Sequence, residues 1–192
     1  MKKLLAVVIA AFAVTLTGYA ASASDYRAAA ERGDVKAQLN LGLCYMNGDG
    51  VAKNLAEAVR WWRKAAIQGN KEAQYILGLC YMNGDGVAKN PAEAVRWFRK
   101  AAEQGDADAQ VNLGRYYHLG VGVTEDLAEA VRWWRKAAEQ GNADAQFFLG
   151  LCYVAGRGVP IDHAEGVRWH RKAARQGHKE AQEFLKRIGD TW

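Results

Sequence analysis

The chain has 192 residues, of which half are apolar, and its 26 basic and 21 acidic side chains give a formal net charge of +5 at pH 7. The apolar share is large enough for a continuous hydrophobic core. The small excess of positive charge does not indicate binding to nucleic acid.

The first 23 residues are typical of a secretory signal peptide. Lys2 and Lys3 precede an apolar run over residues 4–16, and a small-x-small motif ends at Ala23. The run is shorter than the roughly 20 residues that a membrane-spanning helix needs. We therefore predict cleavage after Ala23 and a periplasmic or secreted protein with no lipid anchor and no membrane span. An N-terminal helix that stays uncleaved as an anchor is the alternative.

From residue 25 onwards the sequence repeats itself every 36 residues without an insertion. A period of this length is the signature of stacked repeats, each of which buries its apolar face against the next. We divide the chain into a signal peptide at 1–23, an N-terminal half-repeat at 24–36, four repeats at 37–72, 73–108, 109–144 and 145–180, and a C-terminal capping helix at 181–192.

Each repeat is predicted to contain two helices. In the first repeat the second helix follows Asn54, a good N-cap, with Glu57 three residues later in the pattern of a capping box. Gly69 is expected to end this helix in a left-handed conformation. Gly48 and Gly50 lie between the two helices and indicate a tight turn with positive φ. Calcium binding by this Gly-Asp-Gly turn is excluded, because later repeats lack the aspartate and no ladder of ligands follows.

The repeat has the pattern Ala-x-x-x-Leu-Gly-x-x-Tyr-x-x-Gly-x-Gly-Val, followed by Ala-x-x-Trp-x-x-Lys-Ala-Ala-x-Gln-Gly. It resembles the Sel1-like repeat, a relative of the tetratricopeptide repeat, and the resemblance covers residues 25–188. The resemblance implies an all-α fold, a right-handed α-solenoid of helix-turn-helix repeats with a concave face, and an adaptor function. Some relatives carry disulfides within each repeat, and some were described as binding or cleaving β-lactams. Nothing in the present sequence supports that chemistry.

Three cysteines, Cys44, Cys80 and Cys152, occupy one position of the repeat. Equivalent positions in stacked repeats lie a helix-packing distance of roughly 8–10 Å apart, whereas a disulfide needs Cα atoms within about 7 Å. We therefore expect buried free thiols. A regulatory or intermolecular disulfide is the alternative.

Residues that are identical in every repeat are explained by the stacking that every repeat must perform. Gly42 and its equivalents are expected to allow close approach between helices. The aromatic residues of this kind are predicted to form the structural core: Tyr45, Trp61, Tyr81, Trp97, Tyr117, Trp133, Tyr153 and Trp169.

Residues that differ between repeats at matching positions are the candidates for function. By the resemblance to tetratricopeptide repeats, four rows of first-helix residues are expected on the concave face. The rows are Leu39, Tyr75, Val111 and Phe147; Leu43, Leu79, Arg115 and Leu151; Met46, Met82, His118 and Val154; and Asn47, Asn83, Leu119 and Ala155. Neighbouring rows are three to four residues apart, so they share one helix face. The predicted partner-binding residues are Leu39, Tyr75, Val111, Phe147, Arg115, His118, Asn47 and Asn83. Packing of these side chains against the neighbouring helix is the alternative.

The second helices carry a regular set of basic residues, which in the first repeat are Arg60, Arg63 and Lys64. Glu57 lies three residues before Arg60 and is expected to pair with it. The set therefore predicts a solvated, partly paired outer face. A basic ridge that meets an acidic partner or an anionic envelope polymer is the alternative.

Catalytic motifs are missing from the sequence. The four histidines lie in the third and fourth repeats, and no cysteine or acid completes a metal set at the usual spacing. The one catalytic pair that we consider joins side chains of different repeats, namely His118 with the thiol of Cys80 or Cys152. We predict no catalytic residue, no metal and no cofactor, and a monomer that binds a partner protein or peptide on its concave face. The alternative functions are an envelope-modifying or β-lactam-hydrolysing enzyme, and an anionic envelope-glycan binder that uses the basic outer face.

Overall fold

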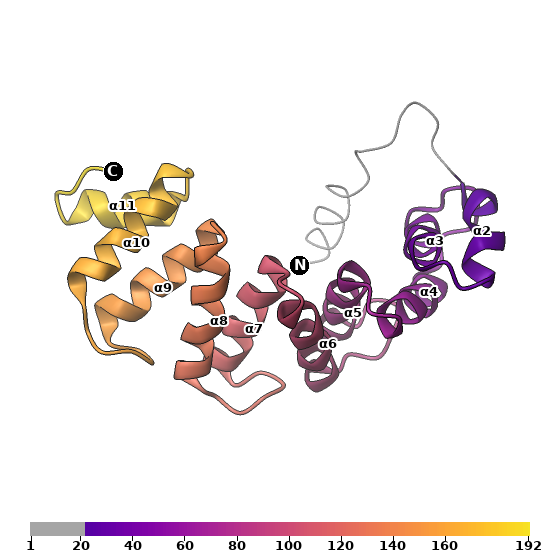
Figure 1. Cartoon of the computed structure of the whole chain (residues 1–192), viewed down its shortest axis with the longest axis horizontal. Helices are drawn as coiled ribbons and strands as arrows, with labels where there is room; N and C mark the ends of the chain where they lie inside the picture. Colours follow the sequence, from indigo (N-terminus) through magenta and orange to yellow (C-terminus); the bar gives the residue numbers. More distant parts are fainter. Residues whose placement is uncertain (1–21) are drawn as a thin grey trace. The chain divides into compact units, whose positions relative to one another are not determined.

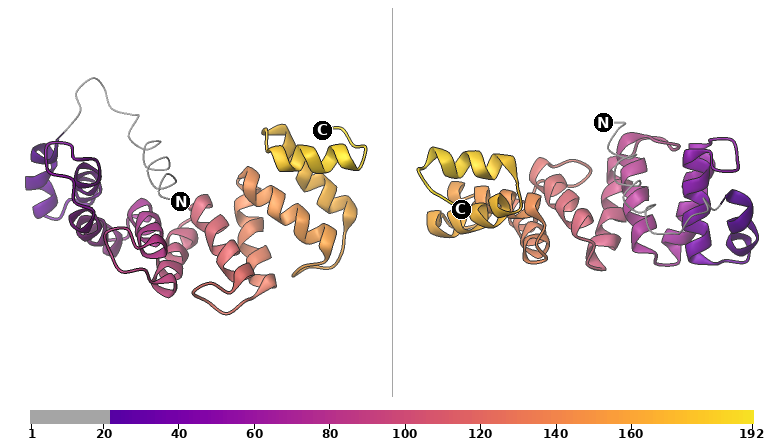
Figure 2. Two further views of the ribbon diagram at one scale, coloured as in Figure 1. Left: turned by 180° about the vertical axis from the view of Figure 1, so that it is seen from behind. Right: turned by 90° about the horizontal axis from the view of Figure 1, so that it is seen from above.

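The computed structural model describes residues 22–192, and this part of the chain is all-helical. Its ten helices pack sequentially as helix-turn-helix repeats, which confirms the predicted fold class (Figure 1). The chain forms two compact units, one ending at Trp97 and the other running from Phe98 to Trp192. Figure 2 shows the helices of each unit from two further directions.

Helices α2 to α5 belong to the first unit, α7 to α11 belong to the second, and α6 contains the boundary between them. Their bounds are α2 (Ala23–Glu31), α3 (Val35–Asn47), α4 (Leu55–Ile67), α5 (Lys71–Asn83), α6 (Pro91–Glu103), α7 (Ala107–Leu119), α8 (Leu127–Glu139), α9 (Ala143–Ala155), α10 (His163–Arg175) and α11 (Lys179–Arg187).

The second helices begin at the predicted N-caps. The Asn54 side chain accepts hydrogen bonds from the backbone N–H groups of Ala56 and Glu57, both at 3.1 Å. Asp126 accepts one from the Glu129 backbone N–H at 2.9 Å. The glutamate completes no reciprocal capping box, because its carboxylate contacts an arginine of the next turn instead, as described below. Half of the predicted motif is therefore present.

The turn between the two helices has the predicted backbone conformation, with φ of +93° at Gly48 and +71° at Gly50. In the second repeat a Cβ at Gly86 would lie 2.3 Å from the backbone carbonyl oxygen of Leu55. The second glycine of the turn is therefore needed for two reasons, namely its positive φ and its close approach to the first turn of the preceding α4.

In the first, third and fourth repeats the core is built around a second-helix aromatic residue that packs on a first-helix glycine. A Cβ at Gly42 would lie 2.3 Å from the indole of Trp62, so the prediction of a close approach at this glycine is confirmed. The Trp62 Nε1–H donates to the Leu39 carbonyl at 3.2 Å. Trp134 repeats this arrangement in the second unit. The predicted tryptophans, Trp61, Trp97, Trp133 and Trp169, are all buried as well.

The tyrosines that were predicted as core residues are half-buried. The side chains of Tyr45, Tyr117 and Tyr153 pack against the buried core clusters, as predicted, but their hydroxyls lie outside the core. Each hydroxyl reaches the surface and accepts a hydrogen bond from an arginine 18 residues earlier in the chain, as in Arg63 to Tyr81 at 2.6 Å and Arg135 to Tyr153 at 2.7 Å. The polar end of the phenol therefore stays at the surface while its ring packs against the core.

The recurring Ala-Gln pair is explained by a buried polar contact. The side-chain amide of Gln38 donates to the Ala30 carbonyl at 3.1 Å, and its oxygen accepts from Gln68 at 2.8 Å. Both ends of this buried amide are therefore satisfied, as burial requires. Gln146 makes the equivalent bonds in the second unit.

The three cysteines are buried, and no disulfide is formed among the described residues. Burial raises the pKa of Cys44 and Cys152 to about 11 and that of Cys80 to about 12. Such thiols stay protonated at neutral pH and are poor nucleophiles.

Most of the predicted signal peptide lies outside the described residues, which start at Ser22. The predicted cleavage point after Ala23 falls at the first residue of α2, where Ser22 is the N-cap and Ala23 is fully buried. None of the helices within residues 22–192 is both long enough and apolar enough to cross a membrane.

Candidate functional site

The second unit contains an open cavity of about 490 Å³. Its walls come from the end of α7, from α8, from α9 and from the turn that follows α9. The lining residues are Arg115, His118, Leu119, Trp134, Phe148, Leu151, Cys152, Val154, Ala155 and Arg157. This volume lies within the range of pockets that hold small ligands or the side chains of a partner.

Aromatic rings form the inner part of this cavity. Trp134 is buried, and its Nε1–H is fixed by a 3.2 Å hydrogen bond to the Val111 carbonyl. Phe148 stacks on this indole, with ring centroids 5.1 Å apart and planes 25° apart. Two large apolar side chains remain accessible at the rim, because Leu119 is 59% exposed and Leu151 is 38% exposed.

His118 contributes a polar atom that has no partner. Its ring lies 5.6 Å from the Trp134 ring, centroid to centroid. The Nδ1 atom is buried and makes no hydrogen bond within the part of the chain that the structure describes. A buried polar atom in this state is costly, so a ligand group that reached it would gain a hydrogen bond.

The charge of the cavity is entirely positive. Arg115 and Arg157 line it and are exposed, and no aspartate or glutamate lies in its walls. Among the described residues neither arginine forms an ion pair.

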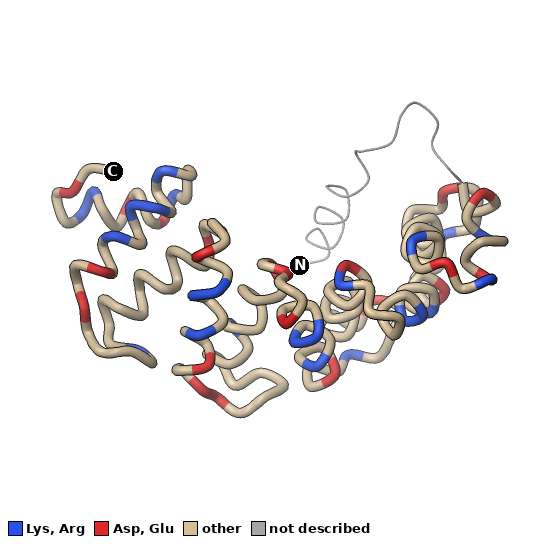
Figure 3. The backbone as a smooth tube through the Cα atoms, viewed as in Figure 1, with Lys and Arg blue, Asp and Glu red and all other residues tan. Residues whose placement is uncertain are grey.

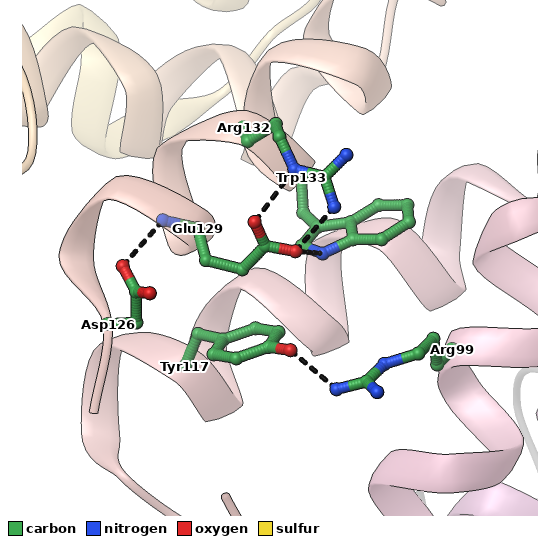
Figure 4. A network of polar contacts seen from close by, with 6 residues as sticks. All are labelled: Arg99, Tyr117, Asp126, Glu129, Arg132 and Trp133. Carbon is green, nitrogen blue, oxygen red and sulfur yellow. Dashed lines mark hydrogen bonds and ion pairs between the residues drawn. The ribbon is translucent and has the colours of Figure 1, made fainter. Parts of the chain in front are cut away.

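Figure 3 marks the positions of the lysines and arginines along the backbone. The basic residues of the second helices contact other side chains of the fold, in contrast to those of the cavity. In the third repeat Arg132 pairs with Glu129, with Nε and Oε2 2.7 Å apart, and the same carboxylate accepts from Trp133 Nε1 at 2.8 Å. Figure 4 shows this network together with the bond from Arg99 to the Tyr117 hydroxyl. The predicted pairing of Glu57 with Arg60 is present at 3.4 Å. Lysines complete the pattern by lying over tryptophan rings.

Three of the four predicted rows contribute to the cavity. Arg115 and Leu151 come from the second row, His118 and Val154 from the third, and Leu119 and Ala155 from the fourth. Asn47 and Asn83 belong to the fourth row in the first unit and are exposed, but their amides donate to Asp49 and Asp85 within their own turns, at 3.1 and 3.2 Å.

The first row is placed differently from the prediction. Tyr75 is only 7% exposed and Val111 is also buried, so the expectation that Tyr75 projects from a concave face is wrong. Leu39 is half-buried beside the indole that bonds its carbonyl. Phe147 is half-buried and packs on His170 and His178, with ring centroids 5.4 and 4.6 Å apart. In the first, third and fourth repeats this row lies against the second-helix aromatic of its own repeat, which explains its burial.

Sequence reasoning missed Trp134, Phe148 and Arg157. Trp134 follows a tryptophan that is identical in every repeat, so it was not considered separately. Arg157 did carry a signal, because the first two repeats have Asp49 and Asp85 at this position.

A second unusual group lies near the C-terminus. His170 occupies the position of Trp62 and Trp134, is fully buried, and has no hydrogen-bond partner for either ring nitrogen among residues 22–192. Phe184 covers it at a centroid distance of 4.2 Å. Burial, and to a lesser degree the charge of nearby His178, lowers the pKa of His170 to about 4. Within the described residues no cluster of histidine, cysteine, aspartate and glutamate is arranged to hold a metal ion.

Comparison with protein families gives four consecutive matches to the Sel1 repeat, at residues 35–70, 71–106, 107–142 and 143–178. No curated protein matches the chain.

Solved structures of bacterial repeat proteins are similar to the chain. A protective antigen of uropathogenic Escherichia coli is 43% identical with a TM-score of 0.83, over 88% of this chain and 37% of that one. A Sel1 repeat protein from Oxalobacter formigenes is 41% identical with a TM-score of 0.74, over 85% and 65%. An immunity protein from Pseudomonas aeruginosa is 26% identical with a TM-score of 0.50, over 86% and 61%. The chain thus spans less than two thirds of the length of each of these proteins.

Proposed function

Because the chain belongs to the Sel1 repeat family, we propose that it is an exported, monomeric interaction scaffold that binds a segment of a partner protein in the cavity between α7 and α9. The observation that carries the proposal is the cavity itself, in which accessible apolar side chains lie beside arginines that pair with no carboxylate of the described fold.

The lining has the composition of a recognition surface. Aromatic residues and arginine are the residue types that contribute most to binding energy at protein interfaces. The rings of Trp134 and Phe148 are held rigidly by contacts with each other, so little conformational entropy is lost when a partner covers them. The relatives with a stated role are named as a protective antigen and an immunity protein, and neither name denotes an enzyme.

Binding without turnover is favoured over catalysis. Cys152 and His118 both line the cavity, as a thiol-dependent enzyme would require. Burial raises the pKa of Cys152 to about 11, however, whereas reactive cysteines have a lowered pKa. Recognition of an anionic glycan by the outer face is also less favoured, because the arginines there already contact glutamate or tyrosine.

Photo-crosslinking in the producing cells tests the proposal. A photoreactive amino acid is placed at Leu151 on the cavity rim and, as a matched control, at the exposed Arg96 on the outer face of α6. We expect a discrete protein adduct from position 151 alone. An adduct from position 96 alone, or none from either position, contradicts the proposal.

A further inference from the structure

We infer that the cavity between α7 and α9 recognises a partner segment in which a large apolar side chain lies next to a carboxylate. This inference rests on the proposed function and specifies the chemistry of the bound segment.

The repeats serve as internal controls for this site, because they share one backbone and one set of stacking contacts. At the position of Arg115 the other three repeats all have leucine. His118 corresponds to Met46, Met82 and Val154, and Leu119 corresponds to two asparagines and an alanine. None of these substitutions is required by the stacking, since the other repeats stack without them.

The turn after α9 also differs from the equivalent turns of the first two repeats, because a basic residue replaces an acidic one. In the first two repeats Asp49 and Asp85 accept hydrogen bonds from the asparagine two residues earlier and so close their own turns. In the fourth repeat Ala155 and Arg157 replace this pair. The turn therefore presents a guanidinium to the cavity where the earlier repeats have a carboxylate engaged with its own loop.

The aromatic lining of the cavity indicates that the bound segment carries a large apolar side chain. Trp134 and Phe148, with Leu151 at the rim above them, line a space large enough for an aromatic or branched aliphatic side chain. Burial of such a side chain there removes apolar surface from water on both partners.

The two arginines that line the cavity indicate that the bound segment also carries a carboxylate. A neutral apolar segment would cover Arg115 and Arg157 without pairing them, and desolvating an unpaired charge is unfavourable. A carboxylate would instead accept charge-assisted hydrogen bonds from a guanidinium, which presents two parallel donors to it. A small inorganic anion would leave the aromatic walls unused, so the combination favours an acidic peptide segment.

Titration of the isotopically labelled protein with three peptides tests the inference. Each peptide is a Gly/Ser nonapeptide with blocked ends, and the central residues are Glu-Phe-Glu, Lys-Phe-Lys or Glu-Ala-Glu. We expect chemical-shift changes at the Trp134 indole and the Leu151 amide with the Glu-Phe-Glu peptide alone.

Charge reversal provides the second arm of the test. The double variant R115E/R157E is expected to bind the Glu-Phe-Glu peptide at least about tenfold more weakly, because its charge-assisted hydrogen bonds are lost, and to bind the Lys-Phe-Lys peptide instead. The matched control R175E/R187E changes the net charge equally at exposed arginines of α10 and α11 and is expected to bind like the unaltered protein. An amide spectrum with unchanged dispersion verifies that both variants are folded.

Several results overturn the inference. These are equal binding of the two Phe-containing peptides, no response to the Glu-Phe-Glu peptide, or equal loss of binding in the control variant. If any of these occurs while crosslinking from position 151 still yields a protein adduct, the scaffold function stands and the chemistry assigned to the ligand is wrong. If crosslinking fails as well, the proposed function is wrong too.

Discussion

His170 is expected to make the stability of the C-terminal repeat depend on pH. Its imidazole is fully buried between Phe147 and Phe184, and both nitrogens lack a hydrogen-bond partner within the described fold. A second titratable side chain nearby is His178, whose nitrogens lie 3.4 Å from Asp144 and 3.3 Å from Glu180. A proton on His170 would therefore be held in an apolar site beside a second imidazole.

The sign and size of the effect follow from linkage. The pKa of His170 falls from 6.5 in an unfolded chain to about 4 in the fold, so between these pH values the unfolded state binds more protons. Its contribution to stability is complete above pH 6.5 and is lost as the pH falls towards 4. At about 1.4 kcal/mol for each pKa unit, the total loss is about 3 kcal/mol.

The assay compares unfolding by urea, followed by circular dichroism, for the unaltered protein and for His170→Phe between pH 7 and pH 4. Phenylalanine is compatible with the fold, because Phe98 occupies the equivalent position of the second repeat. The comparison cancels the carboxylates, which titrate in both proteins. We expect the free energy of unfolding of His170→Phe to rise relative to the unaltered protein by about 3 kcal/mol over this range.

The control is His163→Gln, which removes an exposed histidine from the first residue of the same helix. It is expected to leave the pH dependence unchanged. Parallel pH profiles for the unaltered protein and His170→Phe would refute the reasoning, since they would mean that the folded protein protonates His170 as easily as the unfolded chain does.

The structure makes further predictions about stability and reactivity. Trp97→Ala removes a buried indole and should lower the free energy of unfolding by about 3–5 kcal/mol, measured by urea denaturation. Gly86→Ala should destabilise the protein more than Gly84→Ala, because both have positive φ but only the former places a Cβ against the Leu55 carbonyl; thermal melts of the two variants decide this. Cys80 should react with a thiol reagent only after unfolding, because burial raises its pKa to about 12, and labelling with and without urea measures this.

The architecture was predictable because its determinants are local and are repeated. The N-cap of α4 depends on Asn54 and the amides that follow it, and the turn depends on Gly48 and Gly50, whose φ angles are positive as predicted. Each signal recurs at a spacing of 36 residues, so four copies support one another. Recurrence indicated that the tyrosine rings pack on the core, but it did not reveal that each hydroxyl bonds to an arginine, as in Arg63 to Tyr81.

The cavity was predictable only in part. A helix face can be deduced from spacing, and this located Arg115, His118 and Leu151 on the side where the cavity opens. The contributions of Trp134 and Phe148 depend on how α8 and α9 pack, which a periodic pattern does not specify.

Variation between repeats has two physical causes, and separating them is the key to this fold. The fully buried second-helix position carries Trp62, Phe98, Trp134 and His170, and the residues 23 positions before these are Leu39, Tyr75, Val111 and Phe147. A large indole thus accompanies an aliphatic residue, and a smaller ring accompanies an aromatic one. Cores tolerate such exchanges when the total volume is kept.

The first row of predicted binding residues therefore varies to fill the core, which is why Tyr75 and Val111 are buried. The changes at Arg115, Leu119 and Arg157 have no such compensation, because these side chains are exposed. The two arginines also pair with no carboxylate of the described fold. Side chains that differ between repeats without filling the core are free to contact a partner, and in the second unit these three side chains line one cavity.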